Sequence, residues 1–266
     1  MTHLESRRER TIDRAARRYA ADLRRAGPTG SYAELRAYLG SPVPVLGIRT
    51  PEFRRRLREF DRTLGPLRAP ELARVLARLW RGTTYEERLS AIELLDRHPE
   101  GRTPALWRQV DRWVDTATGW ALSDSLAAGP ISGWLAAEPV RFREVLRWTR
   151  SPNFWRRRAA SYALRDWVLA GRLDRPFRLL DRLLDDEEFW VRRAVGTWLR
   201  ECGKRDRART NSFLRAHAGR LSRVTITVAT ERSPKAFRAE LRRIRAGAEM
   251  RRPRRVVRPA SRIRDR

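Results

Sequence analysis

A few positions along the chain combine an aromatic ring, a carboxylate and a guanidinium group at regular spacings. Trp120 and Asp124 lie one helical turn apart in GWALSDSLA, so their side chains share one helix face. Arg158 follows Trp120 after 38 residues, and Thr197 follows Arg158 after 39, next to Trp198. In a protein built from repeats of about this length, positions one repeat apart line up along one surface. The spacing therefore predicts a row of aromatic, acidic and basic groups on the concave wall of a solenoid.

This combination suits the cleavage of a glycosidic bond next to a phosphate. Such cleavage develops positive charge on the sugar, which a fixed carboxylate such as Asp124 stabilises while it orients the attacking water. The ring of Trp120 would add attraction for a cation. Arg158 would hold the neighbouring phosphate. The set is coherent for the removal of a base that already carries positive charge, such as an alkylated purine.

The same residues also have purely structural interpretations, which the spacing leaves open. Asp124 can be ion-paired with an arginine of a neighbouring helix. Tryptophans at helical spacing are more often core than site, and we expect Trp155 and Trp190 in the core because the repeat preserves both. The arginines of the repeat can form solvated faces or pairs between repeats; they are Arg157, Arg158, Arg192 and Arg193.

A stretch of 15 residues occurs twice, with an offset of 35. NFWRRRAASYALRDW begins at Asn153 and EFWVRRAVGTWLREC begins at Glu188. A weaker copy, YEERLSAIELLDR, begins at Tyr85. Self-similarity at this spacing is typical of stacked helical hairpins, each too small to bury its own apolar face. The repeat predicts an all-α solenoid of HEAT-like antiparallel helix pairs, curved into a superhelix with a basic concave face.

The helical pattern fills most of the chain. A charged amphipathic helix is expected over 5–26, Ser31 and Glu34 form a capping box, and Thr50 caps a helix that has Pro51 at its first position. Further helices are expected over 70–80, 84–97, 104–116, 119–128, 137–149, 153–170, 173–183, 187–202, 207–219 and 234–247. The segment 222–230 has a strand-like composition, but among helices it is better interpreted as a loop or a helix. We expect one repeat domain over 1–250 and a disordered basic tail over 251–266.

The charge of the chain points to a polyanion as its partner. The net charge is +28, and nearly all of the positive charge is arginine, because lysine occurs only at 204 and 235. The planar fork of arginine suits phosphate, so nucleic acid is the first interpretation. A GC-rich genome would also produce a composition rich in Arg, Ala, Leu and Trp, and that alternative stays open.

Other classes of protein fit poorly. The single cysteine, Cys202, excludes an internal disulfide and suits a reducing cytoplasm. The three histidines are far apart, so neither a histidine metal cluster nor a Ser-His-Asp triad is visible. No long apolar run or signal peptide is present. We therefore expect a cytoplasmic, nucleoid-associated protein that needs no metal or cofactor, binds no membrane and acts as a monomer on duplex DNA.

Several motifs, in order over roughly residues 30–215, resemble the AlkD-type DNA alkylation-repair glycosylases, which are built from HEAT-like repeats. They are LRAYLGSPVPVLGIRTPEFRRRLREF, LWRGTTYEERLSAIELL, GWALSDSLA, SPNFWRRRAA and EEFWVRRAVGTWLRE. The resemblance implies excision of N3- and N7-alkylated purines from duplex DNA, with no metal or organic cofactor and without flipping the base out of the helix. Most enzymes that act on bases extrude them, so this would be an exception.

By position, Trp120 matches the first tryptophan of the family's site, Asp124 its catalytic aspartate and Arg158 its phosphate-facing arginine. The family's last tryptophan follows the glycine of an Ala-Ile-Gly-Trp motif, whereas here Gly196 is followed by Thr197, and Trp198 comes one place later. One residue turns a side chain by about 100° around a helix. The shift therefore predicts that Thr197 faces the DNA. With Trp198, the remaining candidate DNA contacts are the arginines Arg157, Arg192 and Arg193.

Two further hypotheses compete with a glycosylase. A non-catalytic solenoid that recognises distorted or branched duplex would explain both the charge and Thr197. A HEAT-type scaffold for protein partners would need a strongly acidic partner.

Overall fold

Every regular element in the described chain is helical. The computed structural model describes residues 3–28 and 32–251, and strands are absent from these two ranges. The α-helices are α1 (His3–Ala26), α2 (Ala33–Leu39), α3 (Thr50–Leu64), α4 (Ala69–Trp80), α5 (Tyr85–Arg97), α6 (Pro104–Thr116), α7 (Trp120–Leu126), α8 (Ser132–Ala137), α9 (Phe142–Trp148), α10 (Phe154–Tyr162), α11 (Arg165–Leu169), α12 (Asp174–Asp181), α13 (Phe189–Arg205), α14 (Arg207–His217), α15 (Arg223–Ala229) and α16 (Lys235–Arg251). The prediction of an all-α repeat fold is confirmed.

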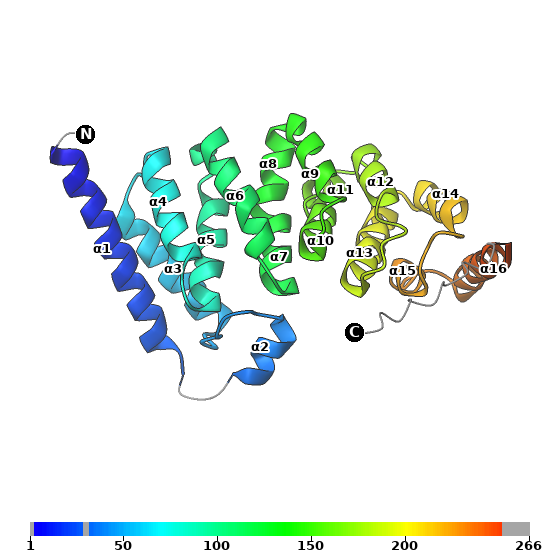
Figure 1. The fold of residues 1–266 in the computed structure, drawn as a ribbon, viewed down its shortest axis with the longest axis horizontal. Coiled ribbons are helices and arrows are strands. Elements are labelled where there is room, and N and C mark those ends of the chain that lie inside the picture. The colour runs from blue at the N-terminus through cyan, green and yellow to red at the C-terminus, as the bar shows by residue number, and fades with distance from the viewer. Residues whose placement is uncertain (1–2, 29–31, 252–266) are drawn as a thin grey trace, which may run out of the picture.

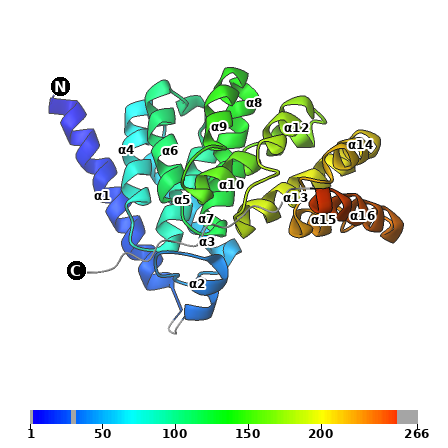
Figure 2. The same ribbon diagram turned by 45° about the vertical axis from the view of Figure 1, so that its right-hand side comes forward.

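The helices form two layers along a curved row (Figure 1). In one layer α3, α5, α7, α10, α13 and α15 each pack against the next. Helices α4, α6, α8, α9, α12 and α14 form the other layer, along the upper edge of Figure 1. Figure 2 shows that the C-terminal helices α12–α16 swing away from the N-terminal half. The two copies of the sequence repeat lie on α10 and α13, which are direct neighbours, as stacked repeats require.

A continuous hydrophobic core joins the repeats. It runs from Ile12 in α1 to Leu241 in α16. Within it, the rings of Trp80 and Trp113 stack with centroids 4.8 Å apart. No repeat buries its apolar face alone, so each helix pair depends on its neighbours for stability.

The structure differs from the predicted helices mainly at breaks. The helix expected over 119–128 corresponds to α7, after which a π-helical turn, Ala127–Ile131, leads into α8. Gly129 has non-helical backbone angles, φ −88° and ψ −109°, so the chain is kinked where the sequence predicts that the helix ends, before Pro130. The helix expected over 153–170 is interrupted between α10 and α11. The segment 222–230 is helical, as α15.

The predicted N-caps need two comments. Thr50 is the first residue of α3 rather than its cap, because Arg49 occupies that position and makes no side-chain cap bond. Ser31 lies outside the described residues, and Tyr32 is the N-cap of α2. The first residue of the predicted tail, Arg251, is the last residue of α16, and the rest of that tail, 252–266, lies outside the described residues.

Candidate active site

A cavity of 760 Å³ lies at the junction of α7, α10, α13 and α15, with α2 at its edge. Five of the predicted site residues line it, namely Trp120, Asp124, Arg158, Arg193 and Thr197. The lining also includes residues that the sequence did not single out for a site, which are Tyr38, Tyr162, Phe189, Trp190, Arg200, Thr227, Val228 and Glu231. Helices distant in sequence thus bring aromatic, acidic and basic groups around one space.

Asp124 and Arg158 form a bidentate ion pair on the wall of this cavity. Arg158 Nε donates to Asp124 Oδ1 and Arg158 Nη2 donates to Asp124 Oδ2, both at 2.7 Å. The side chain of Arg158 is 4% exposed and that of Asp124 is 13% exposed. Burial raises the pKa of the Asp124 carboxyl above its ordinary value, and Arg158 opposes that shift. The Asp124 carboxylate is therefore ion-paired with an arginine of a neighbouring helix, which is the structural interpretation that the spacing left open.

The guanidinium of Arg158 is fully engaged by protein groups. Its Nη1 donates to the carbonyl oxygen of Trp190 at 2.6 Å, and Nη2 also donates to the Tyr162 hydroxyl at 3.0 Å. Its carbon lies 4.8 Å from the ring centroid of Tyr162 and 5.7 Å from that of Trp190. The expectation that Arg158 faces a phosphate is therefore wrong for this structure, because the side chain is buried and each of its guanidinium nitrogens donates to a protein group. Its role here is to fix Asp124.

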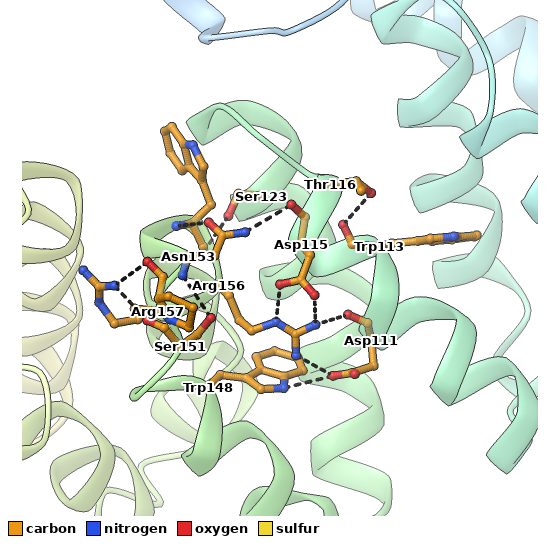
Figure 3. Close-up of polar contacts among 12 residues, drawn as sticks. Asp111, Trp113, Asp115, Thr116, Ser123, Trp148, Ser151, Asn153, Arg156 and Arg157 are labelled. Atoms are coloured by element: carbon orange, nitrogen blue, oxygen red, sulfur yellow. Dashed lines mark hydrogen bonds and ion pairs between the residues drawn. The ribbon is translucent and has the colours of Figure 1, made fainter.

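Three consecutive arginines on α10 have different partners, because each residue turns by about 100° around the helix. Arg156 reaches α6, where its donors lie 2.6 Å from Asp115 Oδ1 and 2.9 Å from Asp111 Oδ1 (Figure 3). Arg157 points to the loop before α13 and pairs with Asp186 at 2.6 Å. Of the three, Arg158 is the one that lines the cavity.

Polar contacts at its start hold α10 in place (Figure 3). The Asn153 side chain accepts from the N–H of Trp155 and donates to the Asp115 carbonyl oxygen. Ser123 on α7 donates to the Trp155 carbonyl oxygen. These bonds fix α10 against α6 and α7, and so they set where Arg158 meets Asp124.

Trp120 is placed by a close approach of two loops. Gly119 has φ +83°, and a Cβ there would lie 1.9 Å from the Gly40 carbonyl oxygen. Glycine at both positions lets the end of α2 touch the start of α7. The Trp120 indole then donates to the Tyr38 carbonyl oxygen, and the two rings meet edge to face at 5.4 Å. Neither contact could be read from the sequence, since 82 residues separate the partners.

On α13 the structure separates two neighbouring candidates. Thr197 lines the cavity, and that it faces the DNA stays a prediction. Trp198 is 6% exposed and belongs to the core, so its candidacy as a DNA contact is corrected. Arg193 is exposed at the cavity, and its guanidinium makes no ion pair within residues 3–28 and 32–251. Among the described groups at this cavity, it is the one best able to meet a phosphate.

The two remaining arginine candidates lie outside the cavity. Besides Asp186, Arg157 donates to the Ser151 carbonyl oxygen at 2.8 Å. Arg192 donates to the Asp186 carbonyl oxygen at 2.5 Å. Both are thus engaged at the loop between α12 and α13, and the Arg157–Asp186 ion pair is a pairing between repeats of the kind that the sequence left open.

Trp190 is the functional candidate that sequence reasoning missed. We expected Trp155 and Trp190 in the core, but both are only partly buried and Trp190 lines the cavity. Their rings lie 5.9 Å apart, and the exposed Phe189 extends the aromatic wall. Trp155 and Trp190 occupy equivalent positions in the two copies of the repeat, and this equivalence alone does not show whether a position is in the core. In α13 the position borders the cavity.

Searches for other kinds of site were negative over the described residues. No three His, Cys, Asp or Glu side chains in residues 3–28 and 32–251 are grouped so that they could hold a metal ion. Across the same part of the chain, none of the helices has the length and apolar character needed to span a bilayer.

The fold and the cavity define an α-helical repeat protein with a carboxylate–guanidinium pair between aromatic walls. A family model described as DNA alkylation repair enzyme matches residues 19–232. The chain belongs to this family. Family membership gives it a role in the repair of alkylated DNA, and DNA as its binding partner.

Two solved structures share the fold. A predicted DNA alkylation repair enzyme from Enterococcus faecalis is 16% identical with a TM-score of 0.65, covering 79% of this chain and 99% of its own. AlkD2 from Streptococcus mutans is 16% identical with a TM-score of 0.59, covering 81% and 98%. No curated protein matches the chain.

Proposed function

We propose that the protein is a monofunctional DNA glycosylase that excises cationic N3- and N7-alkylated purines from duplex DNA without flipping them out. The observation that carries the proposal is the Asp124 carboxylate, fixed by Arg158 on the wall of a cavity lined by Trp120 and Trp190. The proposal extends to a monomer that works on the nucleoid in the cytoplasm.

The chemistry needs charge stabilisation more than proton transfer. When the N-glycosidic bond breaks, its electron pair leaves with the cationic base, which becomes neutral, and positive charge develops on the deoxyribose. Asp124 stabilises that charge and accepts a hydrogen bond from the water that attacks the sugar carbon. The faces of Trp120 and Trp190 add attraction for the cation, worth about 0.5–2 kcal/mol each.

The pairing with Arg158 is compatible with this role. A carboxylate has about four lone-pair sites, and the bidentate contact occupies one on each oxygen. The remaining sites can accept from water. Because Arg158 is itself held by Trp190 and Tyr162, the carboxylate keeps a fixed direction and loses little energy to reorientation during reaction.

Retention of the base in the helix is compatible with its reactivity. An alkylated cationic purine is already a good leaving group, so the protein can act on the sugar from the backbone side. The exposed Arg193 supplies a phosphate contact for that approach. A 2-aminopurine placed next to the lesion should keep its stacked, quenched fluorescence on binding, whereas strong brightening would contradict retention of the base.

The direct test measures free 7-methylguanine released from duplex DNA. We expect release well above the spontaneous rate with the natural chain and a return to the spontaneous rate with Asp124→Asn. The matched control is Asp186→Asn, which breaks the similar Arg157 pair outside the cavity. If the natural chain and Asp124→Asn release base equally slowly, the protein is not a glycosylase.

One observation favours a second candidate function. The bidentate Arg158 contact compensates much of the negative charge of Asp124, and Thr197 stands where the resemblance implies a tryptophan. A DNA-binding protein that recognises distorted or branched duplex would need no free carboxylate. Tight, salt-sensitive binding to such duplexes with no base release would select it.

A further inference from the structure

Tyr162 is a residue of the cavity that directly contacts the Asp124–Arg158 pair. It lies at the end of α10, one helical turn after Arg158. Its hydroxyl accepts from Arg158 Nη2 at 3.0 Å. Since the hydroxyl accepts from the guanidinium, its single proton is left for the carboxylate, and Tyr162 lowers the pKa of Asp124. Tyr162 thus bonds Arg158 directly and also acts on Asp124.

The ring of Tyr162 also restricts the pair. The guanidinium carbon of Arg158 sits 4.8 Å from its centroid, within the range of a cation–π contact. A ring beneath the guanidinium and a hydroxyl at its edge leave Arg158 few alternative directions. Both contacts come from one side chain, so a single residue orients Arg158, which in turn holds Asp124.

Trp198 supports Tyr162 from behind. The two rings meet edge to face with centroids 5.5 Å apart and an interplanar angle of 88°. The Trp198 indole N–H is buried and has no hydrogen-bond partner among the described residues. Trp198 therefore contacts Tyr162 through its ring and not through a hydrogen bond. The resemblance implies a tryptophan directly after Gly196, where this chain has Thr197. With the tryptophan one place later, the indole lies against Tyr162 instead of lining the cavity.

We propose that Tyr162, backed by Trp198, is a positioning residue that fixes the direction of the Asp124 carboxylate for base release. This inference rests on the proposed function, and it adds a residue outside the Trp120, Asp124 and Arg158 set. Tyr162 acts through Asp124 and Arg158 rather than on the substrate. The charged and titratable groups that share the cavity with Asp124 are Arg158, Tyr162, Arg193, Arg200, Glu231 and Tyr38.

Tyr162→Phe tests the inference, because it removes the hydroxyl and keeps the ring. We expect kcat for 7-methylguanine release to fall about tenfold, with KM for duplex nearly unchanged. The acid limb of the pH–rate profile should move to higher pH, because a hydrogen bond donated to a carboxylate favours its ionised form. Tyr19→Phe is the matched control, since it removes another buried hydroxyl bond, to Ser90, outside the cavity.

A second readout does not depend on activity. The Asp124 carboxyl, followed by carbon-13 NMR in the full-length protein, should titrate about half a pH unit or more higher in Tyr162→Phe than in the natural chain. Trp198→Leu should shift it in the same direction, because Tyr162 loses its support. If the natural chain releases no base, the proposed function fails, and this titration alone decides the positioning role. An unchanged Asp124 titration in Tyr162→Phe would overturn it.

Discussion

At the scale of single residues, neighbouring side chains of the same type do different work. Arg156, Arg157 and Arg158 are adjacent and equally charged, yet each is held by a different carboxylate. Arg156 and Arg157 connect α10 to neighbouring segments, and Arg158 fixes the candidate catalytic residue Asp124. Charge alone therefore does not mark a DNA contact. What matters is whether a guanidinium already has a partner. Within the described residues, Arg193 makes no ion pair, whereas the other two arginines that line the cavity, Arg158 and Arg200, are paired with carboxylates.

The environment of Asp124 predicts how activity depends on pH. Burial raises the pKa of this carboxyl above 3.8, whereas Arg158 and Tyr162 oppose the shift. Asp124 can stabilise positive charge only when ionised, so base release should fall on acidification at a pH above the ordinary aspartate range. The measurement is a pH–rate profile corrected for spontaneous depurination of duplex alone.

The raised pKa of Asp124 also predicts how the stability of the folded protein changes with pH. Because the folded-state pKa is raised, the contribution of Asp124 to stability is present at low pH and is lost as pH rises through the folded pKa. Asp124→Asn should show neither the acid limb nor this dependence. An acid limb at or below the ordinary aspartate value in the natural chain would contradict the prediction.

At the scale of elements, the site depends on how closely α13 packs against its neighbours. Gly196 is where α13 meets α15, and a Cβ there would lie 2.7 Å from the Val228 Cβ and 3.0 Å from the Thr225 carbonyl oxygen. Val228 and Thr197 both line the same cavity. The missing side chain at 196 therefore sets the width of the site at this end.

Gly196→Ala should separate α13 from α15 and destabilise the protein by about 1–3 kcal/mol, as overpacking does. Differential scanning calorimetry measures the resulting fall in Tm. Gly203→Ala on the same helix is the matched control, since its Cβ would meet Thr210 at an ordinary 3.6 Å. Alanine there should be neutral or stabilising, by up to about 1 kcal/mol. Equal losses of Tm in the two variants would argue against a special role for the contact at 196.

At the scale of the whole molecule, the net charge of +28 gives DNA binding a strong electrostatic component. Many arginines nevertheless serve as ties between helices, as the pairs of Arg156 and Arg157 show. The net positive field is therefore a property of the whole chain, whereas specific phosphate contacts depend on the few guanidinium groups left exposed near the cavity.

Affinity for undamaged duplex should fall steeply with salt concentration, because each neutralised phosphate releases counterions. Arg193→Ala should lower the slope of log K against log salt by about one. Arg157→Ala changes the net charge equally but removes a group already paired with Asp186, and it should leave the slope nearly unchanged. Fluorescence anisotropy at several salt concentrations measures both. Equal slopes for Arg193→Ala and the natural chain would remove Arg193 from the interface.

Much of the fold could be predicted because its signals are local. The 35-residue repeat predicted that α10 and α13 would be stacked neighbours, and they are. The positions of Trp120, Asp124, Arg158 and Thr197, about one repeat apart, predicted a common surface, and all four line one cavity. The expected helix end before Gly129 and Pro130 is present as a kink with non-helical angles at Gly129, whereas the π-helical turn that joins α7 to α8 there could not be predicted from the sequence.

The sequence by itself determined the helical periodicity, the stacking of repeats and the positive charge, since these follow from residue types and their spacing along the chain. Only the tertiary structure decided which charges are already paired, that Arg158 holds Asp124, that Trp190 borders the cavity and that Trp198 lies behind Tyr162. The physical reason is that side-chain partners come from helices 32 to 82 residues apart, and their directions depend on how those helices pack.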